Sequence, residues 1–153
     1  MAGNKNRQKI IDGLITLYAM ELETTENYIA NSVMLDGVRA EEIKKSLAAD
    51  IPAELGHAQQ LAMRIKQLHG RVPGSLKLPR NQTTLQPPKD TTDVVTVIKG
   101  VMAAEQDAIT HYNKVLRQCE GEDYVTQDLL VKLLGQEEAH FIEFEGFLKE
   151  YAK

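Results

Sequence analysis

The stretch Gly-Gln-Glu-Glu-Ala-His-Phe at residues 135–141 places charged side chains at positions where a buried helix face needs apolar ones. Around it, leucine and phenylalanine recur at the spacing of one helix face, from Leu130 to Leu148. Glu137 and His140 fall on this same face, three residues apart, so one lies above the other. A carboxylate that faces a protein core is costly unless it is paired or bound to a metal. These two side chains therefore need a partner.

The same Glu-x-x-His motif occurs a second time, at Glu54 and His57, again on the apolar face of a predicted helix. A single motif of this kind has little specificity, because chance matches on helices are frequent. The repeat extends further, however: in each half of the chain a glutamate on the preceding helix is followed seven residues later by a tyrosine. The separation between the two glutamates is 33 residues in the first half and 32 in the second. The two pairs are Glu21 with Tyr28 and Glu105 with Tyr112.

Apolar residues at helical spacing predict four helices of about 30 residues, each roughly 45 Å long. In the first helix the predicted apolar stripe ends with Ile29 and Val33. Glycines mark the ends of the helices, and an aspartate or a threonine precedes the third and the fourth. The predicted ranges are about 5–36, about 40–69, from a cap at Thr91, Thr92 or Asp93 to about 120, and from a cap at Asp123 nearly to 153.

Between the second and third helices the periodicity stops, and five prolines and glycines occur from Pro73 to Pro88. We expect an extended connector at 71–90, longer than most loops in compact domains. Two short turns and one long middle connection are typical of a four-helix bundle with a single crossover. The predicted fold class is therefore all-α, a four-helix bundle with one long crossover between helices two and three, and we expect 1–153 to form a single domain.

The composition restricts the functions that are compatible with this fold. A formal net charge of −4 argues against a general nucleic-acid binder. The chain has no continuous apolar run of the signal-peptide or membrane-spanning type, so we expect a cytoplasmic protein without a membrane partner. Cys119 is the single cysteine, which excludes an internal disulfide and a cysteine-based zinc site.

Two facing hairpins would bring the repeated polar groups to one level of the core. Four carboxylates and two imidazoles would be balanced by two divalent cations, which removes the cost of burying the charges. Oxygen and nitrogen ligands without thiolate suit iron or manganese, with zinc as another occupant. Carboxylates that bridge favour two metals about 3.5–4 Å apart. The predicted ligands are Glu21, Glu54, His57, Glu105, Glu137 and His140.

With these residues the chain resembles the ferritin superfamily, and most closely the bacterioferritins. The segments 54–58 and 136–140 carry the most specific part of the resemblance. It implies that the six predicted ligands form a ferroxidase site for two iron ions per chain, with Tyr28 beside it as a hydrogen-bond or electron donor. It also implies oxidation of Fe(II) by O2 or H2O2, followed by storage of the Fe(III) mineral.

Two departures from the bacterioferritins matter. Those proteins ligate haem through a methionine directly after the glutamate of helix two, where this chain has Leu55, so we expect no haem there. The sequence ends about where helix four ends, without the short fifth helix of 24-subunit ferritins. This favours a homo-oligomer with the 12-subunit shell of Dps-like proteins, or a dimer. The segment 104–109 also resembles the Dps-like branch that has a bacterioferritin-type site.

Several polar neighbours of the predicted ligands have other interpretations. Glu138 should point off the apolar stripe, although it could replace Glu137 as a ligand. Glu23 and Glu26 are expected on a solvated helix face or along an access path for iron. Tyr112 is either a core residue or a neighbour of the site.

Two other functions remain open at this point. A di-iron or di-manganese oxidoreductase, related to peroxidases, manganese catalases or rubrerythrins, would use the same ligands in a small oligomer without mineral storage. A structural bundle without metal would instead satisfy each polar side chain separately. The repeat favours the metal, because six polar groups in register are difficult to satisfy one by one.

Overall fold

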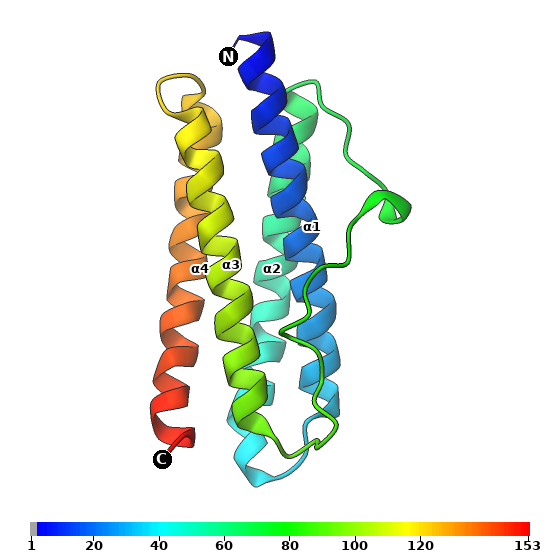
Figure 1. Ribbon diagram of the computed structural model, residues 1–153, viewed down its shortest axis with the longest axis vertical. Coiled ribbons are helices and arrows are strands. Elements are labelled where there is room, and N and C mark those ends of the chain that lie inside the picture. Colours follow the sequence, from blue (N-terminus) through cyan, green and yellow to red (C-terminus); the bar gives the residue numbers. More distant parts are fainter. Residues whose placement is uncertain (1–2) are drawn as a thin grey trace.

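The computed structural model describes residues 3–153, so the first two residues of the predicted 1–153 domain lie outside it. Figure 1 shows the long helices arranged as two hairpins, which are joined by a long connector that runs along the side of the bundle. Within residues 3–153 there is no strand, which confirms the all-α four-helix bundle with one crossover. The helices are α1 (Asn4–Met34), α2 (Glu41–Gln67), α3 (Val94–Cys119) and α4 (Tyr124–Tyr151), with the 3-10 turns η1 (Val38–Ala40) and η2 (Ser75–Lys77).

Aspartate side chains cap the starts of α3 and α4, as predicted. Asp93 accepts a hydrogen bond from the backbone N–H of Thr96 at the start of α3, and Asp123 accepts one from Thr126 at the start of α4. Each cap satisfies a backbone donor that the helix leaves free. None of the helices within residues 3–153 is long and apolar enough to cross a bilayer.

The connector spans 68–93 and is therefore longer than the predicted 71–90. It is held to α1 by Glu23, whose two carboxylate oxygens accept hydrogen bonds of 3.0 Å from the backbone N–H groups of Asn81 and Gln82. Glu23 is consequently buried, so the solvated helix face, one of its two predicted positions, was wrong. Its role is to fix the path of the connector.

The same connector also passes close to α3. A Cβ atom added to Gly100 would overlap the carbonyl oxygen of Thr84 and would lie 3.3 Å from the Cα of Leu85. Leu85 is buried, and its carbonyl accepts a hydrogen bond of 2.9 Å from Asn31 of α1. The connector is thus packed between α1 and α3 at this level.

Two apolar clusters fill the bundle, one toward each end. The first includes Leu14 and Leu130, and the second includes Ile98 and Phe144. The predicted stripe of α1 was wrong at its end, because Ile29 and Val33 are 48% and 71% exposed. Tyr28, one residue before Ile29, is the buried position there, and its side chain points to the polar layer between the clusters.

The close contact at Gly100 generates a prediction about stability. Gly100→Ala should lower the free energy of unfolding by roughly 1–3 kcal/mol, because the added methyl group displaces the connector. Gly146→Ala, in open space within α4, should instead raise it by about 1 kcal/mol by favouring the helix. Urea unfolding of both metal-free variants at one protein concentration measures the difference. Equal effects would contradict the packing of the connector against α3.

Candidate metal centre

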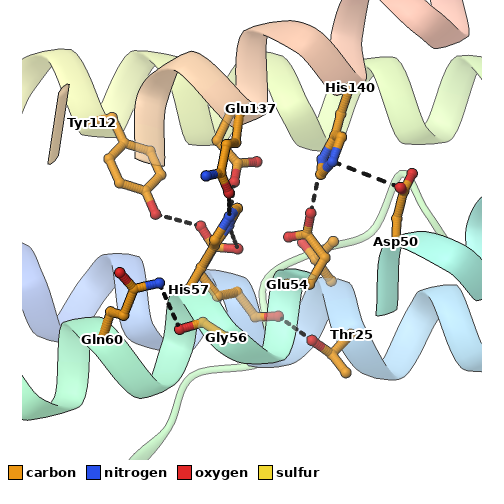
Figure 2. A network of polar contacts seen from close by, with 12 residues as sticks. Thr25, Asp50, Glu54, Gly56, His57, Gln60, Tyr112, Glu137 and His140 are labelled. Atoms are coloured by element: carbon orange, nitrogen blue, oxygen red, sulfur yellow. Dashed lines mark hydrogen bonds and ion pairs between the residues drawn. The ribbon is translucent and has the colours of Figure 1, made fainter. Parts of the chain in front are cut away.

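The six predicted ligands lie in one layer of the bundle, between the two apolar clusters. Figure 2 shows His57 rising from α2 toward Glu137, and His140 descending from α4 toward Glu54. Five of the six side chains are buried, and His140 is 13% exposed. The spacing on each helix produces this arrangement, because residues three or seven apart share a helix face.

The ligand atoms form two groups, and in each group all of them lie within 4.8 Å of one another. Glu54 and Glu137 belong to both groups, and they face each other from α2 and α4. The first group adds Glu21 and His57, and the second adds Glu105 and His140. Two positions that share two carboxylates are the geometry expected for a pair of bridged metal ions.

The histidine nitrogens point into these groups. His57 Nδ1 lies 2.7 Å from Glu137 Oε1 and 3.5 Å from Glu21 Oε2. His140 Nδ1 lies 3.0 Å from Glu54 Oε1 and 3.8 Å from Glu105 Oε1. The two imidazole rings are 6.4 Å apart, so each serves its own group.

Several atoms of the layer are buried yet have no hydrogen-bond partner within residues 3–153. Buried polar atoms normally have partners, so a cluster of unpartnered ones points to a missing ligand. The donor set of oxygen and imidazole nitrogen, without thiolate, fits two ions of iron, manganese or zinc. The unpartnered atoms are both carboxylate oxygens of Glu54, one each of Glu105 and Glu137, and the Nδ1 atoms of His57 and His140.

The two tyrosines of the repeat cross between the hairpins. The Tyr28 hydroxyl donates a hydrogen bond of 2.6 Å to Glu105, and the Tyr112 hydroxyl donates one of 2.6 Å to Glu21. Both tyrosines are fully buried. Tyr112 therefore combines the two predicted roles, because it belongs to the first apolar cluster and its hydroxyl contacts Glu21.

The structure separates the two adjacent glutamates of α4. Glu137 is buried in the layer, whereas Glu138 is exposed and belongs to neither ligand group. Glu26 is also exposed and pairs with Arg80 at 2.7 Å, on the surface of the bundle. Cys119 lies in the first apolar cluster, where burial raises the pKa of its thiol to about 11.

Two residues beside the histidines were not predicted. The Oε1 atom of Gln136 lies 2.5 Å from His57 Nε2, and Asp50 Oδ1 lies 3.7 Å from His140 Nε2. Asp50 could have been found from its position one helical turn before Glu54. Gln136 lies directly before Glu137, where helical periodicity points a side chain off the core stripe, so no sequence signal identified it.

Burial and neighbouring groups together set the electrostatics of the layer. Burial raises the pKa of Glu54 and of Glu137 well above the ordinary value, and the negative charge of Glu21 raises both further. Burial would also raise the pKa of Glu105, but its contacts with Glu137 and His140 outweigh this and lower it. Burial alone would lower the pKa of His140, but the nearby carboxylates of Glu105 and Glu54 outweigh that effect and raise it to about 11. Without metal, the layer therefore retains protons in place of cations.

A four-helix bundle with one crossover and a layer of four carboxylates and two histidines defines the class of ferritin-like carboxylate proteins. Comparison with known families agrees: the Ferritin model, described as a ferritin-like domain, matches residues 11–153. The chain belongs to this family.

Individual relatives point to the bacterioferritins. The "Bacterioferritin" of Desulfovibrio desulfuricans is 31% identical over 151 residues, covering 95% of this chain and 79% of that protein. A crystal structure of that bacterioferritin, described as showing its diiron site in different catalytic states, aligns with a TM-score of 0.78 and 25% identity over 97% of this chain and 84% of that one. A dodecameric thioferritin from Bacteroides fragilis, described as bacterioferritin-related, aligns with a TM-score of 0.84 and 24% identity over 95% and 88%.

The raised pKa values predict how the metal-free protein responds to pH. A raised pKa means that the folded state holds the proton more tightly than the unfolded chain, so stability is lost as the pH rises. For His140 this loss spans the interval from 6.5 to about 11, and it reaches at most ~1.4 kcal/mol per pH unit for one group. The free energy of unfolding should therefore fall with pH across the lower part of this interval, as measured by urea unfolding in the presence of a chelator.

Two controls test the origin of this dependence. His140→Gln should make it less steep, because one of the titrating groups is gone while Glu54 and Glu137 remain. His111→Gln, on the partly exposed side of α3, should leave it unchanged. A parent protein whose stability rises over the same interval would contradict the protonated layer.

Proposed function

We propose that this protein is an iron storage and detoxification protein with ferroxidase activity. The observation that supports this most directly is the sharing of Glu54 and Glu137 by two adjacent ligand groups in the core. Such sharing suits two ions that react together, and it has no use in a purely structural bundle. The similarity to bacterioferritins favours iron as both ions.

In this proposal the six side chains have different roles. Glu54 and Glu137 belong to both ligand groups and would be shared by the two irons, while Glu21 with His57 and Glu105 with His140 would complete one position each. Each Fe(II) gives one electron, so the pair reduces O2 with two protons to H2O2, or H2O2 with two protons to two water molecules. The Fe(III) produced is then the material that is stored.

Tyr28 and Tyr112 hold the outer glutamates of the two positions through their hydrogen bonds. We assign to Tyr28 the additional role of electron donor to the site, as its resemblance to the bacterioferritin tyrosine suggests. Its hydroxyl contacts Glu105, a ligand of the same position as His140.

We further propose a homo-oligomer, with a shell of 12 subunits favoured over a dimer. The bacterioferritin-related protein from Bacteroides fragilis is described as dodecameric. On this chain, apolar side chains remain exposed along α1 and α2, among them Ile29, Val33 and Leu55, and subunit contacts would cover them. Leu55 offers no sulfur ligand at the haem position, so the proposal includes no haem.

The adjacent glutamates of α4 provide a matched test of the iron site. Glu137→Gln should slow Fe(II) oxidation by at least ~10-fold, since even the loss of an outer-shell partner costs 10–100-fold. Glu138→Gln, one residue away and exposed, should leave the rate unchanged. Stopped-flow absorbance after mixing with anaerobic Fe(II) and then O2 or H2O2 measures the rate and the preferred oxidant. Similar rates of Fe(II) oxidation in the two variants would show that Glu137 is not part of the iron site.

Storage is separated from the alternative oxidoreductase by the fate of excess iron. Light scattering before and after aerobic loading with Fe(II) far beyond two per chain should show a large particle that keeps the iron soluble. A dimer that binds two metals per chain and lets the remainder precipitate would support the oxidoreductase without storage and refute the storage function.

The tyrosine pair tests the role assigned to Tyr28. Tyr28→Phe and Tyr112→Phe each remove one buried hydrogen bond of the same length, at a cost of about 1 kcal/mol in stability. We expect Tyr28→Phe to lower the rate of iron oxidation clearly more than Tyr112→Phe. Equal rates would restrict both residues to hydrogen bonding.

A further inference from the structure

The two histidines of the layer have different surroundings behind the metal-facing nitrogen. His57 is 1% exposed, and its Nε2 atom lies 2.5 Å from the amide oxygen of Gln136. His140 is 13% exposed, and its Nε2 atom lies 3.7 Å from a carboxylate oxygen of Asp50, beyond direct hydrogen-bond range. The His57 imidazole is thus held by the neutral amide of Gln136, whereas the His140 imidazole faces the carboxylate of Asp50 without a direct hydrogen bond.

This difference departs from the internal repeat of the chain. An offset of 83 residues relates Glu54 to Glu137 and His57 to His140. The same offset relates Gln136 to Ala53, which has no polar side-chain atom. The contact between Gln136 and His57 therefore has no counterpart in the other half, although the ligands themselves are symmetric.

The chemistry of imidazole gives this contact a consequence. A neutral imidazole binds metal through its unprotonated nitrogen, while the other nitrogen keeps the hydrogen and needs an acceptor. The amide oxygen of Gln136 accepts the hydrogen of His57 Nε2. His57 Nδ1 is then the unprotonated nitrogen that can bind a metal, and it lies 3.5 Å from Glu21 Oε2 and 2.7 Å from Glu137 Oε1.

We propose that Gln136 is a positioning residue that raises the metal affinity of the position completed by His57, although the ligands of the two positions are symmetric. It fixes the tautomer and the ring orientation of His57, and it acts on that position alone. The two metal positions are therefore chemically distinct, one completed by a histidine bound to a neutral amide and the other by a histidine that faces Asp50. This inference rests on the proposed two-metal site.

Titration of the metal-free protein with Co(II) under anaerobic conditions tests the role of Gln136. Calorimetry gives the affinity of each position, and visible absorption of the bound ion reports its ligands, both independent of iron oxidation. Gln136→Leu keeps the approximate size but removes the acceptor. It should weaken one of the two Co(II) affinities by about 10–100-fold and leave the other unchanged.

Matched variants exclude a general packing effect. Gln60→Leu is the control, because Gln60 is also half-buried but its amide bonds only to the backbone of its own helix at Gly56 (Figure 2). Gln136→Glu restores an oxygen acceptor and should recover most of the lost affinity, whereas a purely structural role predicts that an added charge does not. Circular dichroism establishes that each variant is folded, and Gln136→Ala replaces the leucine variant if that one is not.

The outcomes distinguish this inference from the proposed function. A parent that binds two Co(II) ions per chain, with Gln136→Leu indistinguishable from it, would overturn the role of Gln136 and leave the metal site intact. An equal loss in Gln60→Leu, or an equal loss at both positions, would also overturn it. A parent that binds no Co(II) would refute the two-metal site itself, and the inference with it.

Discussion

The burial of four carboxylates in one layer of the core, one from each helix, constrains how the four helices can pack. Negative charges that are buried away from water are unfavourable unless cations or protons balance them. In the metal-free state protons do so, which the raised pKa values of Glu54 and Glu137 express. Two metal cations balance the carboxylates without protonating them, so the polar groups of the layer are best satisfied when metal is bound.

The layer also joins the two hairpins. Tyr28 with Glu105 and Tyr112 with Glu21 connect α1 to α3 by hydrogen bonds in opposite directions. Contacts of His57 with Glu137 and of His140 with Glu54 connect α2 to α4. Apolar clusters lie on both sides and exclude water, so each half of the bundle fixes the register in which the other can pack. A shift of one helix by a single turn would separate the pairs to which that helix contributes.

This dependence on register explains why the sequence could predict that these six side chains lie together. On a helix, a spacing of three or seven residues determines which side chains share a face, and the repeat doubled that signal. The prediction was wrong where tertiary contacts decide the outcome. Glu23 is buried because the connector places two backbone N–H groups against it, and no periodicity encodes the path of a connector. Ile29 is exposed because Tyr28 takes the inward position beside it.

The groups behind the ligands were the hardest to predict, for a related reason. Gln136 reaches His57 from a different helix, and its own helix position suggested only a boundary between core and solvent. The exposure of the layer follows the same asymmetry: His57 is sealed, while His140 and the neighbouring Asp50 are 13% and 17% exposed. In the proposed function the site takes up and releases iron, so it cannot be closed on every side. Because the ligand spacing is nearly symmetric, the difference between the two positions must come from residues outside the repeat, and these are the residues that a repeat cannot predict.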